Sequence, residues 1–118
     1  MKKILLTGAN GFLGCKVAES LAKKNFQVIC FDIASDKIKS NKNLKVYIGS
    51  ILNRYDLDNA IKSCNVVIHL AAMVGVELTE KKRLECLEVN INGTKNVLEA
   101  AVKKKVNKFL FSSSSEVY

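Results

Sequence analysis

Short runs of apolar residues recur along this chain at the length of β-strands. Five such runs are separated by polar or amphipathic stretches, and each is bounded by glycine, lysine or small polar residues. Continuous apolar runs of this length are typical of strands buried on both faces of a sheet. The predicted strands cover residues 3–7, 27–31, 44–48, 65–70 and 108–112.

Between these runs the apolar spacing changes to that of helices. Within residues 11–24, Leu13, Val17 and Leu21 lie four positions apart, which predicts a helix. A brief helix is predicted over 55–62, and the lysine-rich stretch 35–43 is predicted as a surface loop or short helix. One face of a long helix is marked by Leu84, Leu87, Ile91, Leu98, Ala101 and Val102.

Buried strands that alternate with helices favour an α/β fold with a doubly wound parallel sheet of the Rossmann type. Right-handed crossovers then give the strand order 3-2-1-4-5. The chain contains no proline, repeat or low-complexity segment. We therefore expect residues 1–118 to form one domain, which stops directly after its fifth strand.

Composition agrees with an ordinary globular domain, with 48% hydrophobic and 25% charged residues among 118. The longest apolar run, 66–76, contains His69 and is too short to cross a bilayer. The basic and apolar N-terminus reaches Thr7-Gly8 within a few residues, so it reads as a strand and not as a signal peptide. These features predict a cytoplasmic protein without a membrane partner.

The net charge of +8 raises the question of nucleic acid, but the lysines are scattered and lie mostly at the ends of predicted elements. Without interleaved aromatic residues or a binding motif, we expect no nucleic-acid partner. The four cysteines, at 15, 30, 64 and 86, show neither a paired spacing nor accompanying histidines. Reduced thiols, three of them in predicted core elements, and no metal site are therefore expected.

The loop after the first strand carries the strongest chemical signal, Gly8-Ala9-Asn10-Gly11-Phe12-Leu13-Gly14. Gly8 allows a tight turn, Gly11 lets the backbone approach a pyrophosphate, and Gly14 lets the helix pack close to the sheet. The backbone N–H groups of Phe12 and Leu13 would point from the helix N-terminus towards phosphates.

Asp32 follows Gly14 by 18 residues and ends the second predicted strand. An acid at this place accepts hydrogen bonds from the adenosine ribose hydroxyls and repels the additional phosphate of NADP. The alternative is a glycine loop that only caps a helix beside a solvated aspartate. The combination of strand, loop, helix and acid favours a dinucleotide site that prefers NAD, with Ile33 beside Asp32.

The glycine spacing resembles that of the extended short-chain dehydrogenase/reductases, the NAD-dependent epimerase/dehydratase family. Four further stretches are similar to that family: Gly49-Ser50-Ile51, 67–72, 90–101 and 109–118. The resemblance covers the whole chain. It implies that Leu70, Ala71 and Ala72 lie beneath the cofactor and that Asn90 belongs to the long-helix signature of the site.

The resemblance also implies an adenine pocket at the third strand. The family usually has an aspartate where this chain has Ser50. A hydroxyl makes a weaker hydrogen bond than a carboxylate, so we expect adenine recognition to depend on Ile51 and the backbone.

Candidate catalytic residues come from the last stretch. Ser114 stands where the family keeps the hydroxyl that binds the reacting sugar oxygen, and Glu116 stands at the place of an acid/base glutamate. Ser115 replaces the aspartate of the dehydratase pattern, so dehydratase chemistry is disfavoured. His69 is interpreted as a hydrogen-bonded core residue and Tyr118 as a packing residue.

The family's general base, a tyrosine followed four positions later by lysine, is absent from these 118 residues, because Ile51 and Asn59 follow Tyr47 and Tyr55. The resemblance therefore implies the NAD-binding portion of a nucleotide-sugar epimerase or dehydratase-type oxidoreductase that is inactive alone, without its substrate domain. The alternative is a stand-alone NAD-binding or interaction module without turnover. Ending at the fifth strand would leave an exposed apolar edge, so a homo-oligomer through that strand is also expected.

Overall fold

A computed structural model of the chain describes residues 2–71 and 80–111, with side chains described from 83 onward in the second range. Its centre is a parallel sheet of five strands in the order β3-β2-β1-β4-β5, as the sequence predicts. The strands are β1 (Lys3–Thr7), β2 (Gln27–Asp32), β3 (Leu44–Ile48), β4 (Val66–His69) and β5 (Lys108–Phe111). The apolar runs of the sequence thus locate all five strands.

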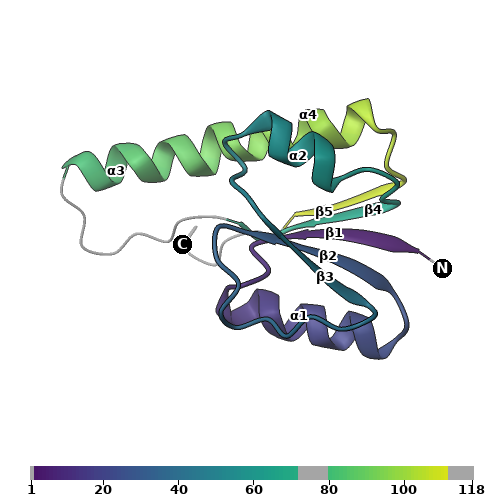
Figure 1. Cartoon of the computed structure of the whole chain (residues 1–118). Coiled ribbons are helices and arrows are strands. Elements are labelled where there is room, and N and C mark those ends of the chain that lie inside the picture. The colour runs from purple at the N-terminus through teal and green to yellow at the C-terminus, as the bar shows by residue number, and fades with distance from the viewer. Residues whose placement is uncertain (1, 72–79, 112–118) are drawn as a thin grey trace.

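Helices cover both faces of this sheet (Figure 1). Helix α1 (Phe12–Lys23) lies on one face, and α2 (Arg54–Ala60) lies on the other together with a long helical stretch. That stretch consists of α3 (Glu80–Leu87), the π-helical segment η1 (Glu88–Gly93) and α4 (Thr94–Lys103). The sequence predicts a long helix here but does not predict its π-helical segment. The loop between β2 and β3 contains no helix.

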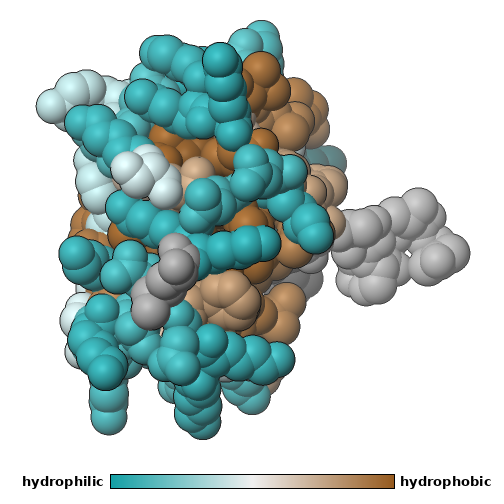
Figure 2. Space-filling view, turned by 90° about the vertical axis from the view of Figure 1, so that its right-hand side faces the viewer, coloured by the Kyte–Doolittle hydropathy of each residue, from teal (hydrophilic) through white to brown (hydrophobic). Residues whose placement is uncertain are grey.

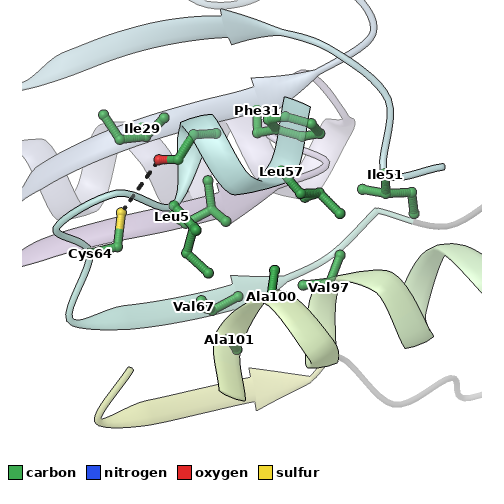
Figure 3. Close-up of a cluster of buried hydrophobic side chains, with 12 residues drawn as sticks. Leu5, Ile29, Phe31, Ile51, Leu57, Cys64, Val67, Val97, Ala100 and Ala101 are labelled. Atoms are coloured by element: carbon green, nitrogen blue, oxygen red, sulfur yellow. Dashed lines mark hydrogen bonds between the residues drawn. The ribbon is translucent and has the colours of Figure 1, made fainter. Parts of the chain in front are cut away.

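The largest buried cluster lies between the sheet and the helices α2 and α4, and Figure 3 shows it in close-up. It combines strand residues such as Leu5, Phe31 and Val67 with Leu57 of α2 and Val97 of α4. A second cluster, around Leu6, Val28 and Cys30, packs beneath α1. The two clusters make the sheet a central layer that is buried on both faces.

The long helix contacts the sheet through a different face from the one that its large apolar residues mark. Its buried residues after the masked side chains are Cys86, Gly93, Val97, Ala100 and Ala101. Of the six residues that predicted a helix face, Ala101 is buried and the other five are exposed, namely Leu84, Leu87, Ile91, Leu98 and Val102. Small residues let the helix axis approach the sheet closely, and this brings α4 against β4.

No helix within the described residues is long and apolar enough to cross a membrane. The four cysteines carry free thiols; Cys15 is partly exposed and the other three are buried. Burial raises the pKa of the Cys30 and Cys64 thiols to about 11. A search of the described residues finds no cluster of three or more His, Cys, Asp and Glu side chains that could hold a metal ion.

Candidate functional site

The glycine loop turns the chain from the carboxyl end of β1 into α1. Gly8 has φ +73°, which favours glycine, and a Cβ there would lie 2.7 Å from the backbone nitrogen of Ala71. The Gly8 nitrogen donates to the Phe31 carbonyl at 3.0 Å, and the Gly11 nitrogen donates to the Gly8 carbonyl at 3.1 Å. The loop therefore fits tightly between the carboxyl ends of β2 and β4.

Gly14 and Gly11 differ in their surroundings. A Cβ at Gly14 would collide with the carbonyl oxygen of Gly8 and lie 2.9 Å from Cα of Ala9. At Gly11 the nearest atom would be the Gly8 oxygen, at 3.3 Å. Gly14 thus serves the packing of α1, whereas Gly11 is exposed at the N-terminus of that helix.

The N-terminus of α1 is open to a ligand. Gly11 occupies the capping position and offers no side chain to the helix, so the first N–H groups, those of Phe12 and Leu13 included, have no side-chain cap. Both side chains are exposed, by 75% and 55%. Such a helix end is a ready site for a phosphate, because N–H groups and helix dipole both favour negative charge.

Asp32 is held at the end of β2 by two backbone donors. Its Oδ2 accepts from the Asn10 nitrogen at 2.9 Å, and its Oδ1 accepts from the Ile33 nitrogen at 2.7 Å. Each carboxylate oxygen keeps capacity for a further donor, such as a ribose hydroxyl. The side chain of Asn10 ties this region to the next turn, since it donates to Asp36 at 2.8 Å and accepts from the Lys37 nitrogen at 2.7 Å.

His69 and Thr7 fix the backbone on the opposite side of the glycine loop. The Thr7 hydroxyl oxygen accepts from the nitrogens of Leu70 and Ala71, at 3.1 and 3.2 Å, and lies 2.6 Å from Nδ1 of His69. With both lone pairs engaged, the hydroxyl has only its proton for the histidine. Nδ1 therefore accepts, and Nε2–H donates to the Thr94 hydroxyl at 3.0 Å.

Burial keeps His69 neutral at neutral pH. The side chain is 1% exposed, and burial lowers its pKa to about 4. Its ring also stacks against Phe111, with centroids 5.7 Å apart. The expectation of a hydrogen-bonded core histidine is thereby confirmed, and the residue additionally orients Leu70 and Ala71 through Thr7.

These segments enclose one cleft of about 240 Å³ at the carboxyl end of the sheet. The cleft brings together eight of the predicted residues: Gly8, Gly11, Asp32, Ile33, Ser50, Ile51, Leu70 and Ala71. Phe31, Gly49 and Val89 line it as well. Gly49 belongs to the stretch 49–51 that resembles the family, whereas Phe31 and Val89 were not predicted. Phe31 and Gly49 directly precede predicted residues at strand ends, which is a usable signal, whereas nothing in the sequence marks Val89.

The other predicted residues stand apart from that lining. Phe12, Leu13 and Gly14 lie in the first turn of α1, and Asn90 is an exposed residue of η1. Ala72, Ser114 and Glu116 lie outside the described residues. The Ser50 Oγ accepts from the Leu52 nitrogen at 3.1 Å, and its O–H proton and second lone pair remain available for a further hydrogen bond.

A dinucleotide fits this arrangement. The cleft combines a backbone approach without side chains, an open helix N-terminus for phosphates, and a fixed carboxylate for a ribose. Parallel α/β sheets bind ligands at this edge, where the strand order reverses, and here the reversal lies between β1 and β4. Fold and cleft together define the class of dinucleotide-binding α/β domains.

Comparison with known proteins refines this class. A family model described as the NAD-dependent epimerase/dehydratase family matches residues 4–118. The chain therefore belongs to that family. Its sequence is 38% identical over 122 residues to a UDP-N-acetyl-alpha-D-glucosaminuronate decarboxylase of Bacillus cytotoxicus, covering 99% of the chain and 38% of that protein.

Solved structures agree with the sequence match. Epimerase Mth375 of Methanothermobacter thermautotrophicus superposes with a TM-score of 0.89 at 32% identity, over 97% of this chain and 35% of that one. MoeE5, solved with UDP-glucuronic acid and NAD, gives 0.86 at 31% identity, over 98% and 38%. The chain thus spans little more than a third of the length of these relatives.

Proposed function

We propose that residues 1–118 form the NAD-binding domain of an enzyme that acts on nucleotide sugars by transient oxidation at a sugar hydroxyl. One observation carries the proposal: the glycine loop and the fixed Asp32 carboxylate face the same cleft at the carboxyl end of a doubly wound sheet. The family membership and the nucleotide-sugar relatives support it. NAD, when bound, supplies a hydride acceptor that can return the hydride.

Each segment of the cleft then has a role toward the cofactor. The N-terminus of α1, with Gly11, Phe12 and Leu13, would hold the pyrophosphate, while Gly14 keeps the helix in place. Asp32 and Ile33 would bind the adenosine ribose, and Ser50 and Ile51 the adenine. On the opposite side Leu70, Ala71 and Ala72 would lie beneath the cofactor, with Asn90 approaching from the long helix.

Ser114 and Glu116 are proposed as the residues that would orient and protonate or deprotonate the substrate. They cannot complete the reaction within these 118 residues, because no tyrosine here is followed four positions later by lysine. That pair lowers the tyrosine pKa so that a phenolate can take the hydroxyl proton. We therefore expect residues 1–118 to bind NAD without turning over a nucleotide sugar. Measurable turnover by this chain would contradict that expectation.

Cofactor preference tests the proposal directly. Calorimetric titration should show tighter binding of NAD than of NADP, since Asp32 repels the additional phosphate. Asp32→Ala should weaken NAD binding by about 1–3 kcal/mol, the range for hydrogen bonds to a charged acceptor. Glu19→Ala is the control, because Glu19 is an exposed carboxylate of α1 outside the cleft lining. Equal or reversed affinities for the two cofactors would contradict the proposal.

A second candidate is a stand-alone NAD-binding or interaction module without turnover. The two candidates differ in the coding sequence downstream of Tyr118. An in-frame Tyr-x-x-x-Lys motif there would support the enzyme, and a stop codon at this point would support the module.

A further inference from the structure

The long helix approaches the cleft through its π-helical segment η1. Val89, near the start of η1, lines the cleft, and Gly93, at its end, is buried. Gly93 has ordinary helical dihedral angles, φ −61° and ψ −46°. Its backbone conformation therefore does not require glycine, and its lack of a side chain must serve packing.

Gly93 packs against Ile51, a predicted adenine contact. A Cβ at position 93 would stand 2.6 Å from Cγ1 of Ile51 and closer still to its Cδ1, but 3.6 Å from its Cβ. The first two separations are far below van der Waals contact, and the third is an ordinary contact. The Ile51 side chain thus occupies the space that any larger residue at position 93 would need.

The same helix also holds the backbone of Ile51. Asn96 lies three residues beyond Gly93, and its Nδ2 donates to the Ile51 carbonyl at 3.0 Å. Gly93 and Asn96 therefore contact the side chain and the carbonyl of one residue. Neither of them lines the cleft itself.

Ile51 has little freedom to move away from this contact. It is 6% exposed and belongs to the buried cluster between the sheet and the helices, where Figure 3 shows it beside Leu57 and near Val97. Ile51 also lines the cleft. A side chain at position 93 would displace Ile51 and so change the lining of the cleft.

We propose that Gly93 and Asn96 are positioning residues that set the width of the adenine end of the cleft by fixing Ile51. This inference rests on the proposed function, in which the Ser50–Ile51 turn contacts adenine. It adds two residues that act on the cofactor only through Ile51. Their effect follows from contacts between segments far apart in sequence, β3–α2 on one side and η1–α4 on the other.

A double-mutant cycle with NAD and AMP as probes tests the Gly93 contact. Gly93→Ala should weaken binding of both about tenfold, because the displaced Ile51 narrows the adenine end. In an Ile51→Ala background the same substitution should change affinity less than about twofold, since the colliding atoms are gone. A general loss of helix packing would not be cancelled in this way.

Thermal unfolding of the same four proteins gives a second readout. Alanine normally favours a helix over glycine by about 1 kcal/mol, so Gly93→Ala should raise the unfolding temperature in the Ile51→Ala background. In the background that keeps Ile51, Gly93→Ala should lower the unfolding temperature, because the added methyl group collides with the Ile51 side chain. The reversal of sign identifies the contact itself.

Asn96→Ala tests the second positioning residue and should weaken NAD and AMP binding about threefold to tenfold. Asn92→Ala is the matched control on the same helix, because its amide donates to the exposed Glu88 carboxylate at 2.7 Å and does not contact Ile51. If Gly93→Ala weakens NAD and AMP binding equally in both backgrounds, the inference is wrong. The same holds if Asn96→Ala and Asn92→Ala weaken binding equally. In either case binding of NAD by the wild-type chain would still support the proposed function. A wild-type chain that binds neither probe overturns the proposed function, and this inference with it.

Discussion

The three glycines of the first loop illustrate how residues of one type differ in physical role. Gly8 is required by its positive φ and by the proximity of Ala71, and Gly14 by the backbone against which α1 packs. Gly11 has φ −75°, which any residue adopts, and it borders the cleft. Substitution at Gly11 therefore separates ligand binding from folding more cleanly than substitution at the other two.

Gly11→Val is expected to abolish measurable NAD binding, a loss of about 3 kcal/mol or more, because its branched side chain would occupy the approach of the pyrophosphate. The free energy of unfolding should change by less than about 1 kcal/mol, since the site is an exposed loop. Calorimetric titration and urea unfolding measure the two quantities. Gly11→Ala adds a smaller side chain and should weaken NAD binding less than Gly11→Val. Unchanged NAD affinity in the Gly11→Val variant would mean that the loop is merely structural.

His69 predicts a pH dependence of stability. Its pKa falls from 6.5 in the unfolded chain to about 4 in the folded protein, through burial. The unfolded state therefore takes up this proton first as the pH drops, and the folded state loses stability between pH 6.5 and 4. The loss should approach about 3 kcal/mol near pH 4, at 1.36 kcal/mol for each pKa unit.

Carboxylates titrate in part of the same range, so the measurement needs a matched variant. His69→Gln keeps a polar side chain that does not titrate, and it should show a smaller loss of unfolding free energy than wild type between pH 7 and pH 4.5. Urea unfolding of both proteins at several pH values gives the difference. Parallel curves for the two proteins would argue against a neutral His69 held by Thr7 and Thr94.

At the scale of elements, small residues let the helices α1 and α4 lie close to the sheet. Helix α1 approaches through Gly14 and Ala18, and α4 through Ala100 and Ala101. The large apolar residues of the long helix are exposed instead. Gly14 lets α1 approach the sheet closely, and Gly11 at the N-terminus of the same helix lines the cleft, so the packing of α1 and the proposed phosphate site are linked through this helix.

Gly14→Ala is accordingly expected to destabilise the fold by about 3 kcal/mol, since the added methyl group meets rigid backbone of Gly8 and Ala9 and no flexible side chain. Helix propensity alone would predict the opposite sign, by about 1 kcal/mol. Urea unfolding decides between the two. Ser20→Ala, at an exposed position of α1, serves as control and should be neutral or slightly stabilising; a stabilised Gly14→Ala variant would contradict the packing argument.

At the scale of the whole molecule, β5 is one of the two edge strands of the sheet that the structure describes. Strand β5 pairs with β4, and the structure describes no strand on its other side. Leu110 and Phe111 of this strand are 48% and 59% exposed. The face at the amino ends of the strands is mostly hydrophilic, with hydrophobic surface gathered along one side of it (Figure 2). Exposed apolar edge strands tend to pair with another copy.

Residues 1–118 are therefore expected to form dimers or larger assemblies through β5, which light scattering over a range of concentrations would detect. Leu110→Lys should shift the mass toward the monomer, because a charge on an edge strand opposes pairing. Ile48→Lys places the same charge on the opposite edge strand, where Ile48 is 54% exposed, and should leave the assembly unchanged. A clean monomer of the wild-type chain at high concentration contradicts the edge argument.

The sequence by itself determined the strands, their order, the glycine loop and the acid that ends β2. These features are local: strand and helix periodicity, a turn that only glycine allows, and a fixed spacing within one β-α-β unit. The roles of all the candidate site residues stay predictions, and Ser114, Glu116 and Ala72 also lie outside the described residues.

Only the tertiary structure decided which face of the long helix is buried, that Val89 lines the cleft, and that Thr7 and Thr94 fix the tautomer of His69. The physical reason is that hydrophobic periodicity records which residues are apolar but not how closely two segments approach. That distance depends on small residues such as Gly93 meeting a partner far away in the chain, and such contacts exist only once the helices have packed against the sheet.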